Sequence, residues 1–200
     1  TSAVTTQSDS NFGPIGWTQM GGDIDGEAEN DFSGKSVSLS SDGKVVAIGA
    51  VGNDGNGNYA GHVRVYKYDS SKTSAVTTQS DSNFGPIGWT RMGGDIDGEA
   101  ESDQSGTSVS LSSDGSIVAI GAYKNDGATS SSNDNRGHVR VYKYNITGNT
   151  WIQRGLDIDG ESAGDQSGKS VSLSSDGNVV AIGSPFNNVS HGVVTIKVYE

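Results

Sequence analysis

The chain carries SVSLSSDGKVVAIGA at residues 36–50 and repeats this segment, with small changes, at 108–122 and 170–184. In the first copy Val37 and Leu39 alternate with serines, which predicts a strand with one apolar face. The pair Asp42-Gly43 suits the positive φ angles of a tight hairpin. The following run, Val45 to Ala50, is apolar almost without a break. We therefore expect an antiparallel pair of strands, with the second strand central and buried on both faces.

Three tryptophans mark the same repeat. Trp17, Trp89 and Trp151 are separated by 72 and then 62 residues, and the Asp-Gly pairs have the same two spacings. Tandem repeats of this length are typical of solenoids and propellers, in which each unit buries its apolar face against a neighbour. Residues 1–18 recur unchanged at 73–90, which indicates a recent duplication within a longer array. The repeats are predicted at 1–88 (with an N-terminal loop and the following connection), 89–150 and 151–200.

Each repeat contains two further strand candidates. The third strand begins at His62, His138 or Val193, and its alternation predicts a half-buried, outer position. The fourth runs from each Trp to Ile24, Ile96 or Ile158, and the tryptophans are expected to anchor the core. Four antiparallel strands per repeat predict an all-β fold of three propeller-like blades. The last blade needs residues 17–24, from this chain or a neighbouring one, as its fourth strand. A β-solenoid that stacks the same strands is the alternative.

Composition narrows the class of protein. The chain has 30 glycines among 200 residues, 32% hydrophobic residues and no Cys, which excludes disulfide frameworks and thiolate sites. A net charge of −11 argues against nucleic-acid partners. The longest apolar runs are too short to insert into a membrane. Asn145 and Asn188 each begin an N-glycosylation acceptor pattern, which predicts a secreted, extracellular or cell-surface protein.

A group of carboxylates follows the fourth strand in each repeat and is the candidate metal site. Acidic side chains two residues apart, followed by Gly, can surround a hard cation such as Ca²⁺. The alternative is that they hydrogen-bond to their own backbone in turns and keep the surface soluble. The candidate ligands are Asp23, Asp25, Glu27 and Asp31; Asp95, Asp97, Glu99 and Asp103; and Asp157, Asp159, Glu161 and Asp165.

Motifs for catalysis are weak. Gly34-Lys35-Ser36 imitates the end of a phosphate-binding loop, but Glu29 stands where the first Gly of that loop belongs, and a strand is predicted to follow. His62, His138 and His191 lie outside any nucleophile motif and are expected to be structural. The carboxylates recur in every repeat, whereas a catalytic centre is normally built once from dissimilar positions. We therefore expect a protein that is not an enzyme.

The full pattern of the repeat resembles the FG-GAP repeat of integrin-type β-propellers. Trp, Asp-Ile-Asp-Gly-Glu, Ser-Gly-x-Ser-Val-Ser-Leu-Ser, Val-Ala-Ile-Gly-Ala and Gly-His-Val-Arg-Val-Tyr follow one another across the chain. Ser33-Gly34 replaces the Phe-Gly pair of that family, and only Gly183-Ser184-Pro185 keeps its proline. The resemblance implies a propeller fold and, in many members, calcium in the turn between the first two strands. That turn is only Ser-Asp-Gly here, so we expect those calcium sites to be missing.

These observations favour a structural function. We expect a non-enzymatic extracellular repeat protein that forms a cell-surface or filamentous assembly through repeat-to-repeat contacts. The alternative is a calcium-dependent adhesion or glycan-binding propeller module, with a glycan or protein ligand. Its ligand would bind at loops 51–61 and 123–137, which we expect on the same face as the carboxylates.

Overall fold

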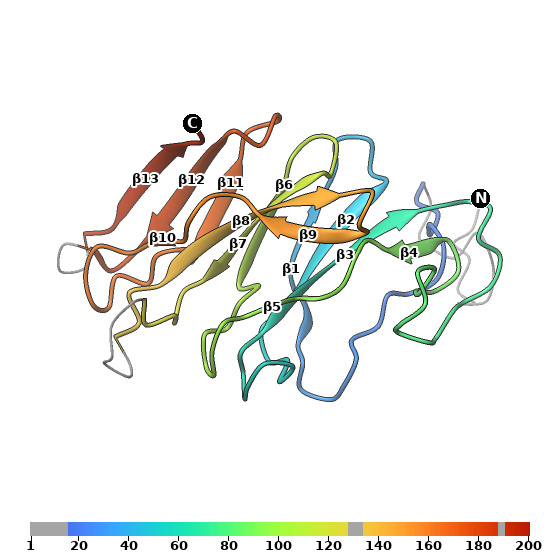
Figure 1. Ribbon diagram of the computed structural model, residues 1–200, viewed down its shortest axis with the longest axis horizontal. Coiled ribbons are helices and arrows are strands. Elements are labelled where there is room, and N and C mark those ends of the chain that lie inside the picture. The colour runs from blue at the N-terminus through green and yellow to red at the C-terminus, as the bar shows by residue number, and fades with distance from the viewer. Residues whose placement is uncertain (1–15, 128–133, 188–190) are drawn as a thin grey trace.

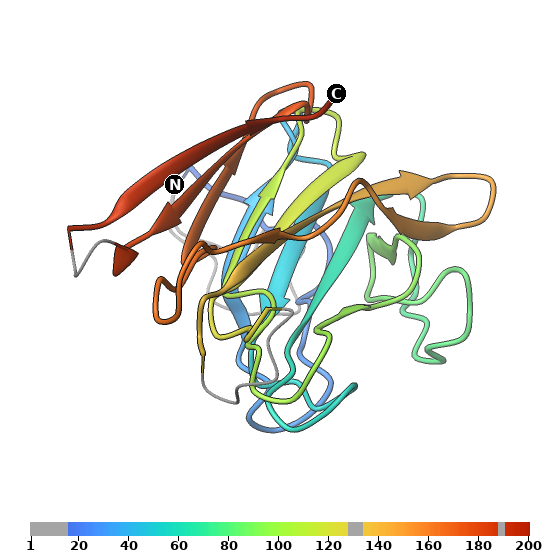
Figure 2. The same cartoon turned by 60° about the vertical axis from the view of Figure 1, so that its left-hand side comes forward.

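A computed structural model describes residues 16–127, 134–187 and 191–200. In these ranges thirteen strands form three antiparallel sheets that lie side by side (Figures 1 and 2). Sheet 1 contains β1 (Ser33–Leu39), β2 (Val45–Ala50), β3 (His62–Tyr68), β4 (Trp89–Arg91) and β5 (Ile96–Asp97). Sheet 2 contains β6 (Ser108–Leu111), β7 (Ile117–Ala122), β8 (His138–Asn145), β9 (Thr150–Gln153) and β10 (Ile158–Asp159). Sheet 3 contains β11 (Ser170–Leu173), β12 (Val179–Ser184) and β13 (Val193–Val198).

The predicted hairpin is confirmed in every sheet. The first two strands pair antiparallel, and the second lies between the first and third. Gly43 adopts a φ of 69°, which a residue with a side chain rarely tolerates. Ser40 Oγ accepts a hydrogen bond from the Val45 N–H at 2.9 Å and donates one to Asp42 at 2.7 Å, which closes the turn. The fold is all-β and propeller-like.

Serines on the first strand join one sheet to the next. The Ser36 hydroxyl donates to the Gly106 carbonyl at 2.7 Å, and Ser108 does the same to Gly168. Each hydroxyl thus crosses from one repeat to the following one, along the line where β1, β6 and β11 lie next to one another. The serine face predicted from the alternation is therefore a polar seam between sheets.

Apolar residues fill the two spaces between sheets. Each sheet has a front face, toward the preceding sheet, and a back face, toward the following one. The back face of sheet 1 contributes Val63 and Val65 to the first core, and the front face of sheet 2 contributes Val109 and Leu111. The second core is built the same way from sheets 2 and 3, with Val139 fully buried. The chain therefore has one core per junction.

The predicted fourth strand is broken in two. β4 pairs with the end of β3 and β5 with its beginning, and the chain between them bulges at Gly93 and Gly94. Gly93 has a φ of 72°, and a Cβ atom there would lie 3.1 Å from Cδ1 of Trp151. This glycine leaves room for the tryptophan of the next repeat. β9 and β10 are separated at the same position of sheet 2.

The first copy of this segment differs from its prediction. Residues 17–24 form no strand, and they lie against sheet 1, where the Gly22 N–H donates to the Ile87 carbonyl at 2.8 Å. Sheet 3 is at the opposite end of the molecule (Figure 1). These residues therefore do not complete sheet 3 of their own chain, and within the described ranges β13 forms its edge. Trp17 is 77% exposed, so the prediction that it anchors the core is wrong.

The sequence repeats are out of phase with the sheets, because the strand that begins at Trp89 or Trp151 belongs to the sheet of the preceding residues. No helix in the part of the chain that the structure describes has the length and hydropathy to cross a membrane.

Candidate functional site

Trp89, which is buried, and Trp151, which is partly buried, occupy sockets of the same design. Trp89 Nε1 donates a hydrogen bond to the Met20 carbonyl, and Trp151 Nε1 donates one to the Met92 carbonyl, both at 2.7 Å. The glycine after each methionine faces the indole, since a Cβ atom there would come within about 3 Å of Cδ1. Each socket is thus made by the repeat that precedes its tryptophan.

An open groove lies at the third position of this series. It has a volume of about 720 Å³ and is lined by residues of β10, the β9–β10 connection and sheet 3. Arg154 and Gly155 stand where Met92 and Gly93 stand in the preceding repeat. A Cβ atom at Gly155 would lie 3.8 Å from the Tyr199 ring and would meet no indole. The groove therefore has the position of a tryptophan socket, and no tryptophan of the described residues occupies it.

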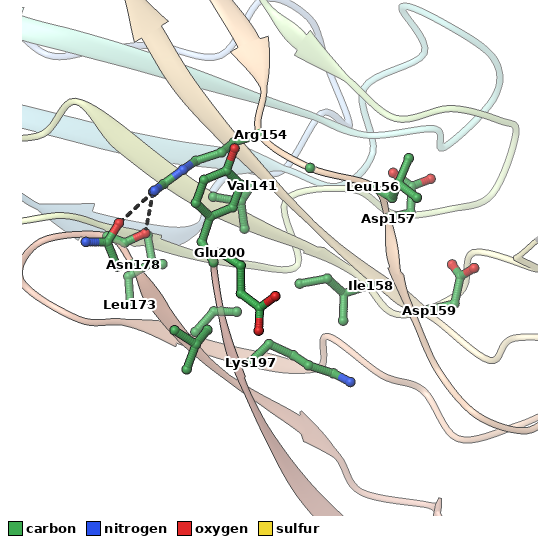
Figure 3. Close-up of a pocket in the computed structure, with 15 residues that line it drawn as sticks. Val141, Arg154, Leu156, Asp157, Ile158, Asp159, Leu173, Asn178, Lys197 and Glu200 are labelled. Carbon is green, nitrogen blue, oxygen red and sulfur yellow. Dashed lines mark hydrogen bonds between the residues drawn. The ribbon is translucent and has the colours of Figure 1, made fainter.

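Figure 3 shows the groove, with Arg154 at one end and Asp157 and Asp159 at the other. The Arg154 guanidinium donates to the Gly177 carbonyl at 2.8 Å and to Asn178 Oδ1 at 2.6 Å. It also lies 3.8 Å from the centroid of the Tyr199 ring, a cation–π contact that holds this wall in place. These contacts fix one wall of the groove, and Leu173 is one of its apolar lining residues.

Apolar residues are exposed on the two outer faces of the molecule. On the back face of sheet 3, Val194 and Ile196 are 70% and 66% exposed, whereas Val63 and Val65 at the same positions of sheet 1 are fully buried. The front face of sheet 1 exposes Leu39 in the same way. Side chains of the kind that form cores at both junctions are therefore exposed at both ends of the described structure.

The predicted carboxylates separate into three environments. The last member of each set, Asp31, Asp103 or Asp165, is buried and closes the turn that precedes its sheet. Asp103 accepts hydrogen bonds from the Ala100 N–H at 3.0 Å and from Asn125 Nδ2 at 2.9 Å, and Asp31 and Asp165 have equivalent partners. Burial raises the pKa of Asp103. These three aspartates hold turns, as the alternative to a metal site predicts.

Six of the other carboxylates combine across repeats into two junction clusters. The first junction cluster contains Glu27, His62, Asp95 and Asp97; the second contains Glu99, His138, Asp157 and Asp159. The glutamate comes from the segment before the sheet, the histidine from its third strand and the aspartates from its fourth. The Asp-Ile-Asp-Gly-Glu motif therefore gives its aspartates to one cluster and its glutamate to the next.

Arginine organises each cluster. Arg64 pairs with Glu27 and makes two hydrogen bonds to Asp95, at 2.7 and 2.9 Å. Burial raises the pKa of Asp95, but the hydrogen bonds and charge of Arg64 outweigh that effect and hold it below its usual value. Burial, together with the negative charge of Asp95, raises the pKa of Asp97. The charges of Arg64, Glu27, Asp95 and Asp97 therefore influence one another.

Two buried histidines complete the clusters. The side chains of His62 and His138 are 4% and 3% exposed, and burial lowers the pKa of both imidazoles. The sequence predicted structural histidines here and did not connect them with the carboxylates. The signal was present, because a histidine precedes an arginine by two residues in both copies, and the third copy has Val193 and Thr195 at those positions.

The remaining predicted residues lie outside the two clusters. Asp23 and Asp25 hold the positions of Asp95 and Asp97 in the segment beside sheet 1, and Glu161 is exposed before sheet 3. In the loops predicted to approach the carboxylates, Asn53 donates a hydrogen bond to Asp31 and Asn125 donates one to Asp103. Asn145 accepts a hydrogen bond from the Thr147 N–H at 3.1 Å. It lies in the connection between the third and fourth strands of its sheet, a part of each sheet that we call the rim. Asn188 lies outside the described residues.

Comparisons with known proteins do not name a family. No family model and no curated protein matches the sequence. Two solved structures have a similar arrangement of strands. The periplasmic gluconolactonase of Pseudomonas aeruginosa is 15% identical, with a TM-score of 0.47 over 82% of this chain and 39% of that chain. The hydrazine synthase of Kuenenia stuttgartiensis is 13% identical, with a TM-score of 0.42 over 88% of this chain and 36% of that chain.

This chain spans well under half the length of either protein. At these values the two likenesses carry no argument about activity. The resemblance to the FG-GAP repeat stays a prediction from the residues.

Proposed function

We propose that this protein is a non-enzymatic structural repeat protein whose copies join end to end. In the proposed contact, the Trp17 segment (residues 17–24) of one copy becomes the outer strand of sheet 3 in the next copy. The observation that carries this proposal is the open groove, which stands where the other two sockets hold Trp89 and Trp151. The acceptor for the incoming indole N–H is the Arg154 carbonyl.

The register of this contact follows from the two complete sheets. Tyr68 pairs with Trp89 in sheet 1, and Tyr144 pairs with Trp151 in sheet 2. Applied to sheet 3, the same register places Trp17 opposite Tyr199. It also places Gln19 opposite Lys197, a position held by the pairs Tyr66–Arg91 and Tyr142–Gln153.

The outer faces support the same contact. Once Trp17 enters the groove, the front face of sheet 1 comes to lie against the back face of sheet 3 of the other copy. Leu39 would then meet Val194 and Ile196, as Leu111 meets the first core. Two different surfaces meet in this contact, so each copy can bind two others, and such head-to-tail contacts generate filaments or rings.

The free energies involved show that a stable contact needs more of the interface than Trp17. Full burial of an indole removes about 150–250 Å² from water, which contributes about 4–6 kcal/mol at about 25 cal/mol per Å². Association costs on the order of 4–15 kcal/mol in lost translational and rotational freedom. Trp17 alone therefore does not secure a stable contact. The exposed Val194 and Ile196 side chains supply the rest of the buried apolar area, because sheet 1 of the other copy would cover the back face of sheet 3 on which they lie.

The proposed location is extracellular or at the cell surface, with Asn145 as a rim position available to a glycan. Its exposed turn and the acceptor pattern support this proposal. The alternative of a calcium-dependent adhesion or glycan-binding module differs in one measurable respect. End-to-end contacts built from apolar faces and strand pairing persist when calcium is removed, whereas calcium-dependent binding does not.

The test is sedimentation velocity and electron microscopy of residues 1–200 at increasing protein concentration, with and without a calcium chelator. We expect chains or rings that persist in chelator. Trp17→Ala should leave single molecules, and Ile146→Ser, which changes an exposed rim residue, should assemble as the unmodified protein does. A protein that stays monomeric, or a Trp17→Ala variant that assembles normally, contradicts the proposal.

Cysteine pairs test the register itself. The chain has no cysteine, so Gln19→Cys combined with Lys197→Cys introduces the only two thiols. Residues directly opposite in a non-hydrogen-bonded antiparallel pair have Cα atoms about 4.5 Å apart, within reach of a disulfide. Oxidation should therefore give a ladder of covalent oligomers. Thr18→Cys with Lys197→Cys is the matched control, since its side chain points to the other face of the strand.

A further inference from the structure

One polar atom in each junction cluster has no explained partner. Nδ1 of His62 and Nδ1 of His138 are buried, and neither makes a hydrogen bond in the structure. A buried nitrogen without a partner costs free energy, because it loses its hydrogen bonds to water. Both atoms point into a group of carboxylates, and the arrangement recurs at both junctions. A partner shared by the histidine and the carboxylates would remove that cost.

The distances in the clusters suit a shared ligand better than hydrogen bonds. His138 Nδ1 lies 3.6 Å from Glu99 Oε2, 3.9 Å from Asp157 Oδ2 and 4.0 Å from Asp159 Oδ1. His62 Nδ1 lies 3.7 Å from Glu27 Oε2 and 4.0 Å from Asp97 Oδ1. Hydrogen bonds of this kind measure about 2.7–3.2 Å. Ligand atoms about 2.1 Å from one tetrahedral ion lie about 3.4 Å apart.

Arginine leaves one oxygen of Glu99 and one of Asp157 facing the histidine, whereas Arg64 binds both oxygens of Asp95 in the first cluster. In the second cluster, Arg140 pairs with Glu99 Oε1 and Asp157 Oδ1. The Oε2 and Oδ2 atoms of the same two residues face His138 Nδ1. The guanidinium thus orients the carboxylates from outside, a task that polar groups commonly perform around a metal. In the second cluster three carboxylates and one guanidinium leave two negative charges, which one divalent cation neutralises. In the first cluster Arg91 also pairs with Asp95, at 2.8 Å, so one negative charge remains.

We propose that each junction cluster binds one divalent transition-metal cation of the zinc type. The ligands are Glu27, His62, Asp95 and Asp97 at the first cluster, and Glu99, His138, Asp157 and Asp159 at the second. One imidazole and three carboxylate oxygens match the four-coordinate sites that Zn²⁺ forms. Ca²⁺ takes six to eight oxygens and no nitrogen, so it fits these donors poorly.

The ion would join neighbouring repeats. The glutamate ligand and the aspartate ligands come from two successive Asp-Ile-Asp-Gly-Glu motifs, and the histidine lies on the sheet between them. The third repeat provides Val193 and Thr195 in place of the histidine and arginine, so it lacks the nitrogen ligand. The expected stoichiometry is therefore two ions per chain. The first metal site shares no residue with the open groove, whereas Asp157 and Asp159 of the second site also line it.

The experiment is titration of the unmodified chain 1–200 with Zn²⁺, followed by calorimetry and by metal analysis after gel filtration. We expect two bound ions per chain, and no saturable binding when Ca²⁺ replaces Zn²⁺. Titration with Co²⁺ should give the visible absorption of a tetrahedral site, which reports the geometry without any mutation. Absence of saturable Zn²⁺ binding, or an octahedral Co²⁺ spectrum, overturns the proposal.

Variants assign the ligands. His62→Gln and His138→Gln should each lower the stoichiometry from two ions to one, and the double variant should bind none. His191→Gln is the matched control, because it changes an exposed histidine of the third repeat and should retain two ions. Circular dichroism establishes that each variant is folded, and a variant that fails to fold is replaced by Glu27→Gln or Glu99→Gln at the same cluster. Folded single variants that retain two ions would refute the ligand assignment.

Discussion

Sheets 2 and 3 share nearly the same sequence pattern and have very different surroundings. Val139 on β8 is fully buried, whereas Val194 at the same position of β13 is 70% exposed. The next pair of equivalent residues on the same face differs in the same way, because Val141 is 9% exposed and Ile196 is 66% exposed. The alternation of apolar residues is therefore a property of the repeat, and burial is decided by whether another sheet lies against it. A repeat of this kind is complete only with a neighbour.

The same contrast holds at a glycine. A Cβ atom at Gly121 in sheet 2 would lie 2.0 Å from the Gly168 carbonyl of the following repeat. At Gly183, the same position of sheet 3, it would meet only the Ser170 hydroxyl, at 2.3 Å. Backbone from the next repeat thus presses on one glycine and is missing at the other. Mutations at equivalent positions should therefore have unequal effects, which gives four tests of the comparison.

The largest effect is expected at the tryptophans. Trp89→Ala removes a side chain that is 7% exposed and should cost about 3–5 kcal/mol in the free energy of unfolding. Trp17→Ala changes an exposed residue, and it should leave the stability of the single molecule within about 0.5 kcal/mol. Urea unfolding at low protein concentration measures both. Equal losses would mean that Trp17 is already buried in the single molecule.

Glycine substitutions come next. Gly121→Ala forces β7 away from the backbone of the next repeat and should cost about 3 kcal/mol, at the upper end of overpacking effects. Gly183→Ala requires only a rotation of the Ser170 hydroxyl, so the single molecule should unfold almost as the unmodified protein does. The alanine at Gly183 should still weaken assembly, because it meets the incoming copy. Thermal unfolding and sedimentation together separate these two effects.

A smaller difference in the free energy of unfolding is expected between threonine substitutions at Val139 and Val194. Val139→Thr buries a hydroxyl among Ile117, Ala119 and Ile182, and an unsatisfied polar group should cost about 1–3 kcal/mol. Val194→Thr places the same hydroxyl in water and should be close to neutral. Both variants keep the β-branched shape, so strand propensity changes little. The comparison fails if Val194→Thr destabilises the single molecule as much as Val139→Thr does.

The smallest effect concerns pH and the hairpin turns, which are alike in all three sheets. Hydrogen bonds from Ser174 and Asn178 lower the pKa of Asp176 from 3.8 to about 2. A carboxyl group with a lowered pKa stabilises the fold above its unfolded value, and that contribution is lost as the pH falls from about 4 to about 2. Asp114 in sheet 2 also has a lowered pKa; burial opposes the shift, but hydrogen bonds from Ser116 and Ser112 outweigh it.

Melting temperatures across that pH range test the effect in both sheets. Asp114→Asn and Asp176→Asn should each flatten the fall in melting temperature by a similar small amount. A much larger change for Asp114→Asn would mean that burial of sheet 2, and not the turn itself, controls the titration.

The sequence was sufficient for the parts of the fold that depend on local pattern. Alternation in β1 and the Asp42-Gly43 turn predicted the hairpin, and the apolar run of β2 predicted its central place. The socket at Gly93 escaped prediction, because it is formed by contact with the indole of Trp151, which is distant in sequence. The exposure of Trp17 escaped for a related reason. A tryptophan at a conserved spacing reads as a core residue whether or not its partner sheet is in place.

The candidate sites were predicted less well. Carboxylates were identified in the correct segments, but a linear cluster gave no sign that Asp95 and Glu99 face different sheets. The buried Asp103 accepts a hydrogen bond from the amide of Asn125, which follows β7 in sheet 2 and is distant from Asp103 in sequence. Only the spacing of histidine and arginine in β3 and β8 pointed to the junction clusters. Strand topology, not composition, decides which of these residues meet.

The connection between the third and fourth strands has a further consequence. It spans residues 69–88 in sheet 1 and only 146–149 in sheet 2, yet the outer strand keeps one register in both sheets. The rim therefore accepts segments of unrelated length and sequence without disturbing the core. In an end-to-end assembly, any segment placed there would be displayed many times along one particle. Weak contacts made by each copy would then add up through multivalency.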